Sequence, residues 1–345
     1  MSDVAQAAGV SQSTVSMVLN NVSGARLSAD TRARVLGMAV QLGYQLPRRF
    51  SASAAPAASE HGHPVIGYLV DEISTSPHPV LSIDGARDAA WQQGCLLQVA
   101  VTRNNAEQEA AAIAALRAQP GLCGVVYSTI FTRAVKVPAS LDGLPLVLLN
   151  CHDAACAAPT VVPAEVAGGH TATEFLIRQG HRRIGFINGE AWMEAAQDRL
   201  KGYRRALATA DLPLDAALMC DGDWMSGSGF ECTLRLMQLQ RPPTAIFCAN
   251  DLMALGALEA LKQLKLRVPE DVSVMGYDDQ EIARHAHPPL TTLVLPNYEM
   301  GQAAVEMLLA GERQRPAGAR IRRSLTKIDG PLVVRESVAA RPPAT

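Results

Sequence analysis

Several features that would mark a membrane protein or an exported protein are missing from this sequence. No run of about 18 apolar residues occurs, so we expect no membrane span. The N-terminus lacks the basic, then apolar, then small-residue pattern of a secretion signal, so we expect a cytoplasmic protein. The seven cysteines form no C-x-x-C pair and are odd in number, which favours reduced, mostly buried thiols.

The motifs of common catalytic and metal chemistry are missing as well. There is no phosphate-binding P-loop and no G-x-S-x-G nucleophile motif, and the G-S-G at Gly227–Gly229 lacks the third glycine of a dinucleotide-binding fingerprint. The histidines at positions 170, 181, 285 and 287 have no metal-ligand partners at suitable spacing, which favours surface or capping roles. We therefore expect no enzymatic activity, no catalytic residue, no metal and no cofactor.

The composition is that of an ordinary globular protein with a basic N-terminal segment. The 345 residues are 48% hydrophobic and 19% charged, which leaves room for two or three domains. The net charge is −2, but five arginines against two aspartates give residues 1–50 a charge of +3. A basic N-terminal segment followed by an acidic remainder of the chain indicates a small DNA-binding module attached to a larger unit.

The first twenty residues have the pattern of a helix-turn-helix. Ala5 and Ala8 supply small residues where two short helices cross, and Gly9 supplies a turn that tolerates a positive φ. Val15 and Val18 begin the apolar side of the second helix. Its outer side, which would face the major groove, consists of Gln12, Ser13, Ser16 and Met17. The segment therefore predicts that the protein binds DNA.

A third helix and a linker follow. Ser28 can cap a helix over about residues 29–42, which would complete a three-helix headpiece over residues 1–46. Residues 47–63 are rich in Ala, Ser and Pro and have no apolar periodicity, which is typical of a hinge or linker.

Beyond the linker, short apolar runs alternate with helical stretches, which indicates an α/β body of parallel sheets covered by helices. These units are too many for one sheet, so we expect two doubly wound parallel-sheet subdomains. The expected N-subdomain comprises residues 64–162 and 294–322. The expected C-subdomain comprises residues 163–293 and 323–338, and residues 339–345 form a tail. A small ligand is expected between the subdomains, at the carboxyl ends of the strands.

Particular strings then give the chain a family resemblance. The headpiece contains DVAQAAGVSQSTVS and TRARVLGMAVQLGY. The body contains, in order, RQGHRRIGFING, DRLKGYRRAL, PPTAIFCANDLMALGALEAL, VPEDVSVMGYDD and PPLTTL. With these strings the chain resembles the lactose/galactose repressor (LacI/GalR) family of bacterial transcription regulators over about residues 3–337. The resemblance implies a homodimer on a near-palindromic operator in double-stranded DNA, and a body like that of periplasmic sugar-binding proteins, with an effector in the cleft.

The resemblance assigns the base-contacting positions to Gln12, Ser13 and Met17. The residues expected to contact phosphates are Ser11, Thr14, Ser16 and Asn20. Helix capping or simple solvation is an open alternative for Thr14 and Ser16. The family usually has Arg where Met17 stands, and Met cannot form the two hydrogen bonds that Arg makes to guanine. We therefore expect an operator that differs from the common family site at that position.

The linker departs from the family pattern as well. In the family, a short helix after the headpiece carries a Leu that wedges into the minor groove and kinks the duplex. Here Ala54 or Ala55 stands near the Leu position, Pro56 would end such a helix early, and Phe50 is out of register. We therefore expect a shallow operator kink or an unusual hinge.

Effector positions follow from the same resemblance. In the C-subdomain they are Trp192, Arg199, Trp224, Asn250 and Asp278, and in the N-subdomain Asp71, Ser128 and Asn150. Planar hydrogen-bonding groups beside an aromatic face suit the adjacent hydroxyls of a sugar. Turn formation for Asp278, helix capping for Asn250, and a core or surface role for Trp192 are open alternatives.

The leading hypothesis is a DNA-binding transcriptional regulator, a repressor of carbohydrate-utilisation genes, controlled by a small sugar. A regulator of the same family that responds to a purine or another metabolite is the main alternative. An exported sugar-binding protein would share the body, but the helix-turn-helix pattern opposes it. A nicotinamide-dependent enzyme is opposed by the missing glycine fingerprint.

Overall fold

The computed structural model describes residues 4, 7–10, 14–15, 18, 28–41, 63–74, 77–155, 158–313 and 324–341. The chain forms two compact units, Met1–Pro56, here called the headpiece unit, and Ala57–Thr345, here called the body. Within the described ranges, every helix is too short or too polar to cross a lipid bilayer.

The headpiece unit has a small apolar core. Helix α3 (Ala29–Gln41) lies where the third helix is predicted. The Thr31 amide donates to Ser28 Oγ at 3.1 Å, which confirms Ser28 as the cap. Gly9 has a φ of +63°, as the predicted turn requires. The buried core side chains are Val4, Ala8, Val15, Val18, Val35 and Ala39. One core therefore joins the three predicted helical segments.

Most of the predicted DNA-contacting residues lie outside the described residues. They are Ser11, Gln12, Ser13, Ser16, Met17 and Asn20. The hinge positions 50–56 also lie outside the described ranges. Thr14 is described and is half-buried, next to the buried Val15. The predicted roles of all these residues in DNA contact stay predictions.

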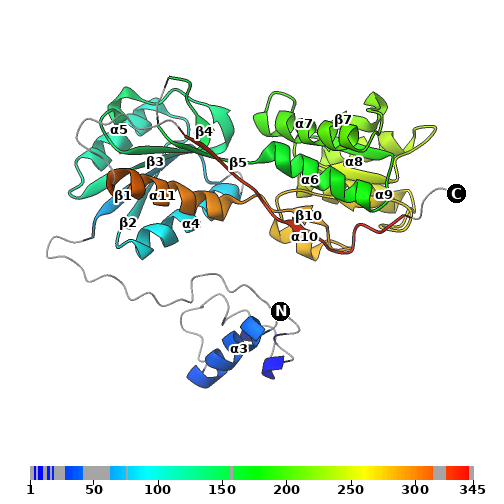
Figure 1. The fold of residues 1–345 in the computed structure, drawn as a ribbon, viewed down its shortest axis with the longest axis horizontal. Coiled ribbons are helices and arrows are strands. Elements are labelled where there is room, and N and C mark those ends of the chain that lie inside the picture. The colour runs from blue at the N-terminus through cyan, green and yellow to red at the C-terminus, as the bar shows by residue number, and fades with distance from the viewer. Residues whose placement is uncertain are drawn as a thin grey trace. The chain divides into compact units, whose positions relative to one another are not determined.

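A six-stranded parallel sheet with the order β11-β5-β4-β3-β1-β2 forms the first half of the body (Figure 1). Its strands are β1 (Val65–Val70), β2 (Leu96–Val101), β3 (Leu122–Ala134), β4 (Leu146–His152), β5 (Thr160–Pro163) and β11 (Leu325–Ile328). All six residues of β1, VIGYLV, are buried, because a central parallel strand is covered on both faces.

Helices cover both faces of this first sheet. Helices α4 (His78–Gln92) and α11 (Asn297–Arg313) pack on the face that holds Tyr68. Helix α5 (Ala106–Arg117) and the 3-10 turn η2 (Ala139–Leu141) pack on the opposite face, which holds Leu69. Because adjacent residues of a strand point to opposite faces, β1 contributes to both cores.

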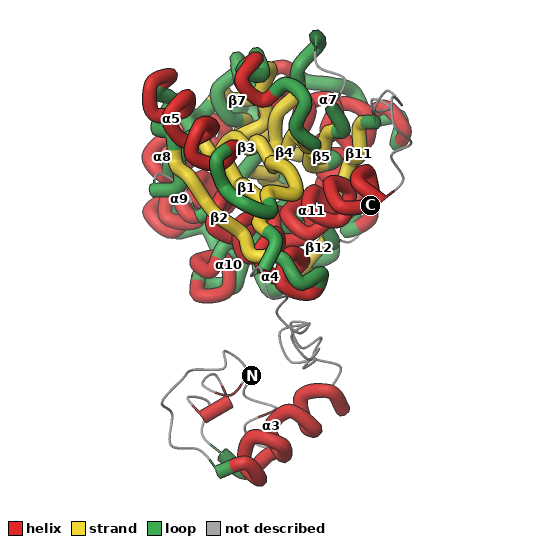
Figure 2. Tube along the Cα trace, turned by 90° about the vertical axis from the view of Figure 1, so that its left-hand side faces the viewer, coloured by secondary structure: helices red, strands yellow, loops and turns green. Residues whose placement is uncertain are grey.

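A four-stranded parallel sheet with the order β7-β6-β8-β9 forms the second half of the body. Its strands are β6 (Ile184–Asn188), β7 (Met219–Asp221), β8 (Ala245–Cys248) and β9 (Ser273–Met275). Its helices are α6 (Glu165–Arg178), α7 (Glu194–Thr209), η3 (Ala216–Leu218), α8 (Ser226–Met237), α9 (Asp251–Gln263) and α10 (Glu281–His285). In Figure 2 helices surround the strands of the body. The alternation of strand and helix confirms the predicted α/β fold class.

The C-terminal segment contributes a strand to each half of the body, which corrects one predicted boundary. We expected residues 323–338 to join the second half, but β11 pairs in parallel with β5 of the first sheet. The chain then enters β12 (Leu332–Val333), which pairs antiparallel with β10 (Thr292–Leu293). A short edge strand with only partly buried side chains carries no apolar pattern that assigns it to one sheet. The other predicted domain boundaries stay predictions.

A disulfide between Cys220 and Cys232 departs from the expectation of reduced thiols. Their Cα atoms lie 5.9 Å apart, on β7 and α8, which are adjacent along the chain. Cys95, Cys151 and Cys248 are buried thiols, as predicted. Burial raises the pKa of the Cys151 thiol to about 12.

Candidate effector site

Two glycines at the crossing of α6 and α7 allow Arg199 to lie in the interior of the second half. A Cβ atom on Gly169 would stand 2.4 Å from the Arg199 carbonyl oxygen, and one on Gly202 would stand 2.4 Å from the Val166 carbonyl oxygen. The helix backbones therefore approach closely, and Arg199, on the inward face of α7, is only 3% exposed.

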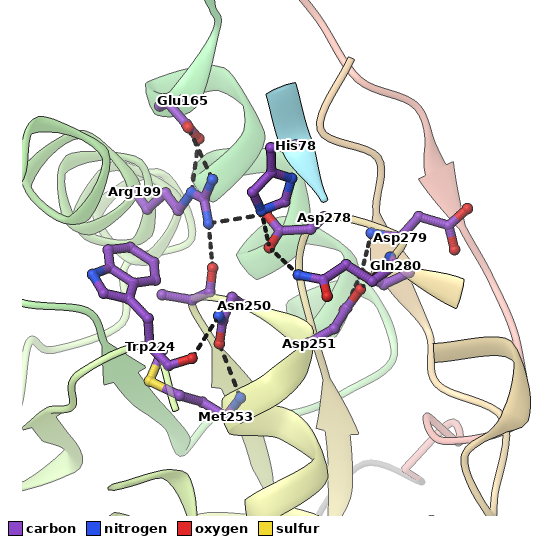
Figure 3. A network of polar contacts seen from close by, with 12 residues as sticks. His78, Glu165, Arg199, Trp224, Asn250, Asp251, Met253, Asp278, Asp279 and Gln280 are labelled. Atoms are coloured by element: carbon purple, nitrogen blue, oxygen red, sulfur yellow. Dashed lines mark hydrogen bonds and ion pairs between the residues drawn. The ribbon is translucent and has the colours of Figure 1, made fainter. Parts of the chain in front are cut away.

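The Arg199 guanidinium is held by four acceptor contacts (Figure 3). Its Nε and Nη2 donate to the two carboxylate oxygens of Glu165, at 2.7 and 2.9 Å. Its Nη1 donates to the Ala249 carbonyl oxygen and, at 3.5 Å, to Asp278 Oδ1. Burial alone lowers the pKa of an arginine, but Glu165 and Asp278 raise the pKa of Arg199 above its ordinary value. Arg199 is thus a permanent cation with at most one N–H left for a further acceptor.

Two aromatic rings flank this cation. The central carbon of Arg199 lies 3.7 Å from the Tyr277 ring centroid and 5.6 Å from that of Trp224. Each of these rings packs against a glycine, where a larger residue would collide with the ring. A Cβ on Gly168 would stand 2.0 Å from the Tyr277 hydroxyl, and one on Gly189 would stand 2.0 Å from the Trp224 indole.

Asp278 is fixed by its backbone as well as by its charge. Its φ is +108°, a conformation that non-glycine residues rarely adopt, and its amide donates to the Leu293 carbonyl oxygen at 2.7 Å. Its Oδ2 lies 3.5 Å from Nε2 of His78, on α4 of the first half, and accepts from Gln280 Nε2 at 3.2 Å. Burial raises the pKa of Asp278, but His78 and Arg199 outweigh this, so the net pKa lies below its ordinary value.

Asn250 joins helix α9 to the loop that carries Trp224. Its Oδ1 accepts from the Met253 amide at 2.9 Å, so the predicted helix cap is present. Its Nδ2 donates to the Trp224 carbonyl oxygen at 2.9 Å, and Trp224 has a φ of +68°. Arg199, Trp224, Asn250 and Asp278 therefore form one connected cluster in the second half of the body, here called the Arg199 cluster (Figure 3).

Trp192 takes a different position from the four residues of this cluster. The residue is 63% exposed, and its Nε1 donates to Glu190 Oε1 at 3.2 Å. Its ring meets Phe131, at the end of β3 in the first half, edge to face, with centroids 5.7 Å apart. The predicted surface role of Trp192 and its predicted effector role are both compatible with this position.

Asp71 and Ser128 line a cavity of about 180 Å³ at the carboxyl ends of β1 and β3. Asp71 Oδ1 accepts from the Ile130 amide at 2.8 Å, and its Oδ2 accepts from Arg133 Nη2 at 2.9 Å. Burial raises the pKa of Asp71 despite these two donors. Ser128 Oγ accepts from the Tyr68 hydroxyl at 3.3 Å. Both residues therefore line open space, and their contact with an effector stays a prediction.

Asn150, on β4, contacts the part of β3 where the pairing register of the two strands shifts. Its φ is +58°, its Oδ1 accepts from Thr132 Oγ1 at 2.6 Å, and its Nδ2 donates to the Thr129 carbonyl oxygen at 3.1 Å. These contacts support a local structural role. Direct contact of Asn150 with an effector stays a prediction.

Sequence reasoning missed three residues of the Arg199 cluster. They are Glu165, the paired carboxylate; Tyr277, the stacked ring; and His78, the contact from the first half. Tyr277 directly precedes the predicted Asp278, so its position in the sequence could have marked it as a residue of the site. Glu165 and His78 lie far from Arg199 in sequence, and no local pattern marks them. The described residues include no group of His, Cys, Asp or Glu placed to hold a metal ion.

Comparisons with known proteins agree with this architecture. A family model described as "Bacterial regulatory proteins, lacI family" matches residues 1–46, and one described as "Periplasmic binding protein-like domain" matches residues 173–338. The HTH-type transcriptional repressor PurR of Haemophilus influenzae (strain PittEE) is 32% identical over 97% of each chain. The chain belongs to the LacI family.

Two solved structures of transcription regulators are similar over nearly the whole chain. The transcriptional regulator CelR in complex with cellobiose has 30% identity and a TM-score of 0.65, and the match covers 97% of this chain and 98% of that chain. The lac repressor dimer bound to operator and the anti-inducer ONPF has 28% identity and a TM-score of 0.65, over 98% of both chains. This LacI-family protein is thus a DNA-binding transcriptional repressor with an effector-binding body, and not an enzyme.

Proposed function

We propose that this repressor controls carbohydrate-utilisation genes and responds to a small sugar bound at the Arg199 cluster. The observation that carries the proposal is the Arg199–Asp278 pair, in which a guanidinium and a carboxylate stand 3.5 Å apart beside aromatic rings. As a repressor it would act in the cytoplasm, on a near-palindromic operator.

The chemistry of this pair suits a hydroxyl group. A separation of 3.5 Å between Nη1 and Oδ1 is at the outer limit of hydrogen bonding, so the direct contact is weak. A hydroxyl accepts one hydrogen bond and donates another, so a single sugar hydroxyl can accept from Arg199 and donate to Asp278. The Trp224 ring offers an apolar face for the C–H side of a sugar. The cellobiose complex of the similar regulator CelR supports the same class of ligand.

An effector at this cluster would act on both halves of the body. His78 of the first half reaches Asp278 of the second, and His152 Nε2, at the end of β4, lies 3.0 Å from Glu194 at the start of α7. A ligand that changes these contacts shifts the halves relative to each other. Allosteric coupling of this kind is typically about 1–3 kcal/mol.

The repressor is also proposed to act as a homodimer through its first half. Helix α4 and the adjacent edge strand β2 expose large apolar side chains: Val80, Leu81, Trp91, Leu96 and Val99. Exposed apolar side chains beside an unpaired strand edge commonly mark an interface. The similar lac repressor is described as a dimer on its operator, and two equal subunits match a near-palindromic site.

A binding experiment with DNA and candidate effectors tests the proposal. Operator DNA is first selected from a random library by the full-length protein, and its affinity is followed by fluorescence anisotropy. Cellobiose and ribose are added in one arm, and the purines hypoxanthine and guanine in the other. We expect a sugar to shift operator affinity. A shift by a purine alone would overturn the sugar proposal, while the identity as a repressor would stand, and similarity to PurR makes this the second candidate.

Two arginine variants locate the site. Arg199→Lys keeps the charge but loses the fork that Glu165 holds, and we expect it to bind operator and lose at least about tenfold in effector response. Arg178→Lys, at an exposed pair on α6, is the matched control and should respond normally. A normal response in Arg199→Lys would exclude the Arg199 cluster as the site.

A further inference from the structure

Cys220 and Cys232 close the base of the loop that carries Trp224. Cys220 lies on β7, Cys232 lies on α8, and the loop between these elements spans residues 222–225. The Trp224 carbonyl of this loop accepts from Asn250, and its ring faces Arg199. Any change in the bond between the two sulfurs therefore acts at the base of a candidate effector contact.

The surroundings of the two sulfurs suit the reduced pair as well as the bridged one. Arg235 Nη2 lies 2.6 Å from Cys220 Sγ and 3.1 Å from Cys232 Sγ. A guanidinium stabilises negative charge on an adjacent sulfur, which a neutral disulfide does not carry. Cys232 Sγ lies 3.6 Å from the Asp221 carbonyl oxygen, an acceptor that only a thiol can use. Among the described carboxylates, none forms an ion pair with Arg235.

The two cysteines differ in how deeply they are buried. Strand β7 is an edge strand of the second sheet, and Cys220 is 8% exposed, whereas Cys232 is 1% exposed. Cys220, whose sulfur lies nearer to the guanidinium, is thus the less deeply buried residue of the pair. Disulfides in cytoplasmic proteins are usually transient and serve catalysis or redox sensing.

We propose that Cys220 and Cys232 form a reversible thiol–disulfide switch whose substrate is a low-molecular-weight disulfide, and that the bridged form orders the Trp224 loop. The thiol chemistry stands apart from the choice of effector. Only its consequence for effector binding rests on the proposed function.

The exchange proceeds in two balanced steps. The Cys220 thiolate attacks one sulfur of the small disulfide, forms a mixed disulfide, and releases the other half as a thiolate. Cys232 then passes its proton to solvent and attacks the Cys220 sulfur, which releases the second half as a thiolate. The protein pair is oxidised by two electrons, and one small disulfide is reduced to two thiols. An excess of reduced thiol reverses both steps.

The first experiment measures the bond itself. Full-length repressor is equilibrated with mixtures of reduced and oxidised glutathione, free thiols are trapped with N-ethylmaleimide, and peptide mapping quantifies the Cys220–Cys232 bridge. We expect the bridged fraction to change with the glutathione ratio. A pair that stays wholly reduced, or wholly bridged, at every ratio would overturn the switch. Arg235→Met should slow oxidation and move its pH profile to higher pH, an effect that a purely packing role would not produce.

The second experiment measures the loop. Hydrogen exchange of the peptide that covers residues 221–226 is compared between the two forms of the unmodified chain. We expect about fivefold faster exchange in the reduced form, within the range typical of coupled sites. Cys220→Ser with Cys232→Ser should give the fast rate in both buffers, while Cys95→Ser, a buried thiol elsewhere, should keep the response. Equal exchange in the two forms would overturn the link to Trp224.

The two proposals fail separately. If cellobiose and ribose bind neither form but the bridge still responds to glutathione, the sugar proposal fails and the switch stands. If a sugar binds both forms with equal affinity, the site stands and its coupling to the thiol pair fails.

Discussion

The central carbon of the Arg199 guanidinium lies over the Tyr277 ring, 3.7 Å from the ring centroid. Tyr277 belongs to the turn after β9, and Glu165, whose carboxylate accepts from Arg199, begins α6. Arg199 therefore contacts two separate elements, and a side chain at Gly168 of α6 would collide with Tyr277. Substitutions on α6 should consequently change the geometry of the Arg199 cluster.

Replacement of Gly168 by Ala tests this packing. The new Cβ would stand 2.0 Å from the Tyr277 hydroxyl, so the Tyr277 side chain or helix α6 must shift. We expect the free energy of unfolding to fall by about 1–3 kcal/mol, the usual cost of overpacking. Urea denaturation measures it. Gly227→Ala on α8, where no atom lies within 4 Å of the new Cβ, should leave stability unchanged or slightly higher. Equal stability of the two variants would contradict this account.

Removal of the Glu165 carboxylate tests the buried pair. Glu165→Ala leaves Arg199, which is 3% exposed, without its two-point partner. We expect a loss of about 3–5 kcal/mol in the free energy of unfolding, as for other broken buried pairs. Glu174→Ala, on the same helix, removes only an exposed partner of Arg178 and should cost about 1 kcal/mol or less. Similar losses of unfolding free energy in both variants would show that the buried Glu165–Arg199 pair contributes no more to stability than the exposed pair.

Asp251 makes stability depend on pH. Its buried carboxylate accepts from the Gln280 amide and from Thr292 Oγ1. Burial, with the nearby Asp278 charge, raises the pKa of Asp251 well above 3.8. Because the folded pKa is raised, this contribution to stability is complete below the unfolded pKa and is lost as pH rises through the folded pKa.

Asp251→Asn should therefore gain stability relative to the wild type as pH rises from about 4 to 8. Urea denaturation at several pH values gives this difference. Asp271→Asn is the control, because its hydrogen bonds from Arg267 lower the pKa of Asp271 and confine its pH effect to below 3.8. The Asp271 difference should be flat above about pH 5. A flat difference for Asp251→Asn as well would contradict the raised pKa.

Sequence patterns predicted those features of the molecule that depend on interactions between residues close together in the chain. Alternation of apolar strands with helices gave the α/β class, and Ser28 caps its helix through a hydrogen bond three residues away. The capping alternative for Asn250 is confirmed for the same reason, because its side chain precedes the helix that it caps. The family resemblance supplied Arg199, Trp224, Asn250 and Asp278, which the fold brings into one cluster.

Long-range packing decides the parts that the patterns missed. Glu165 contacts Arg199 because two glycines let α6 and α7 cross closely. The residues adjacent to Glu165 and Arg199 in the sequence give no indication of this contact. Cys220 and Cys232 stand 12 positions apart, and only the packing of α8 beside β7 brings their sulfurs together. Strand β11 joins the first sheet by backbone pairing, to which its side-chain pattern contributes little.

The exposed apolar side chains on β2 predict where two copies of the repressor meet. Leu96 is 45% exposed and Val99 is 38% exposed, on a strand with an unpaired edge. Glutamates in place of both would put charges into a dimer interface, so Leu96→Glu with Val99→Glu should sediment as a monomer. The operator affinity of this variant should fall about 100-fold or more, because the headpiece of one subunit would bind DNA without the headpiece of a second subunit. Leu214→Glu, at a 48% exposed leucine in the second half, should stay dimeric with normal affinity. A double variant that remains a dimer would exclude β2 as the interface. A wild-type protein that sediments as a monomer, both free and bound to DNA, would exclude the homodimer itself.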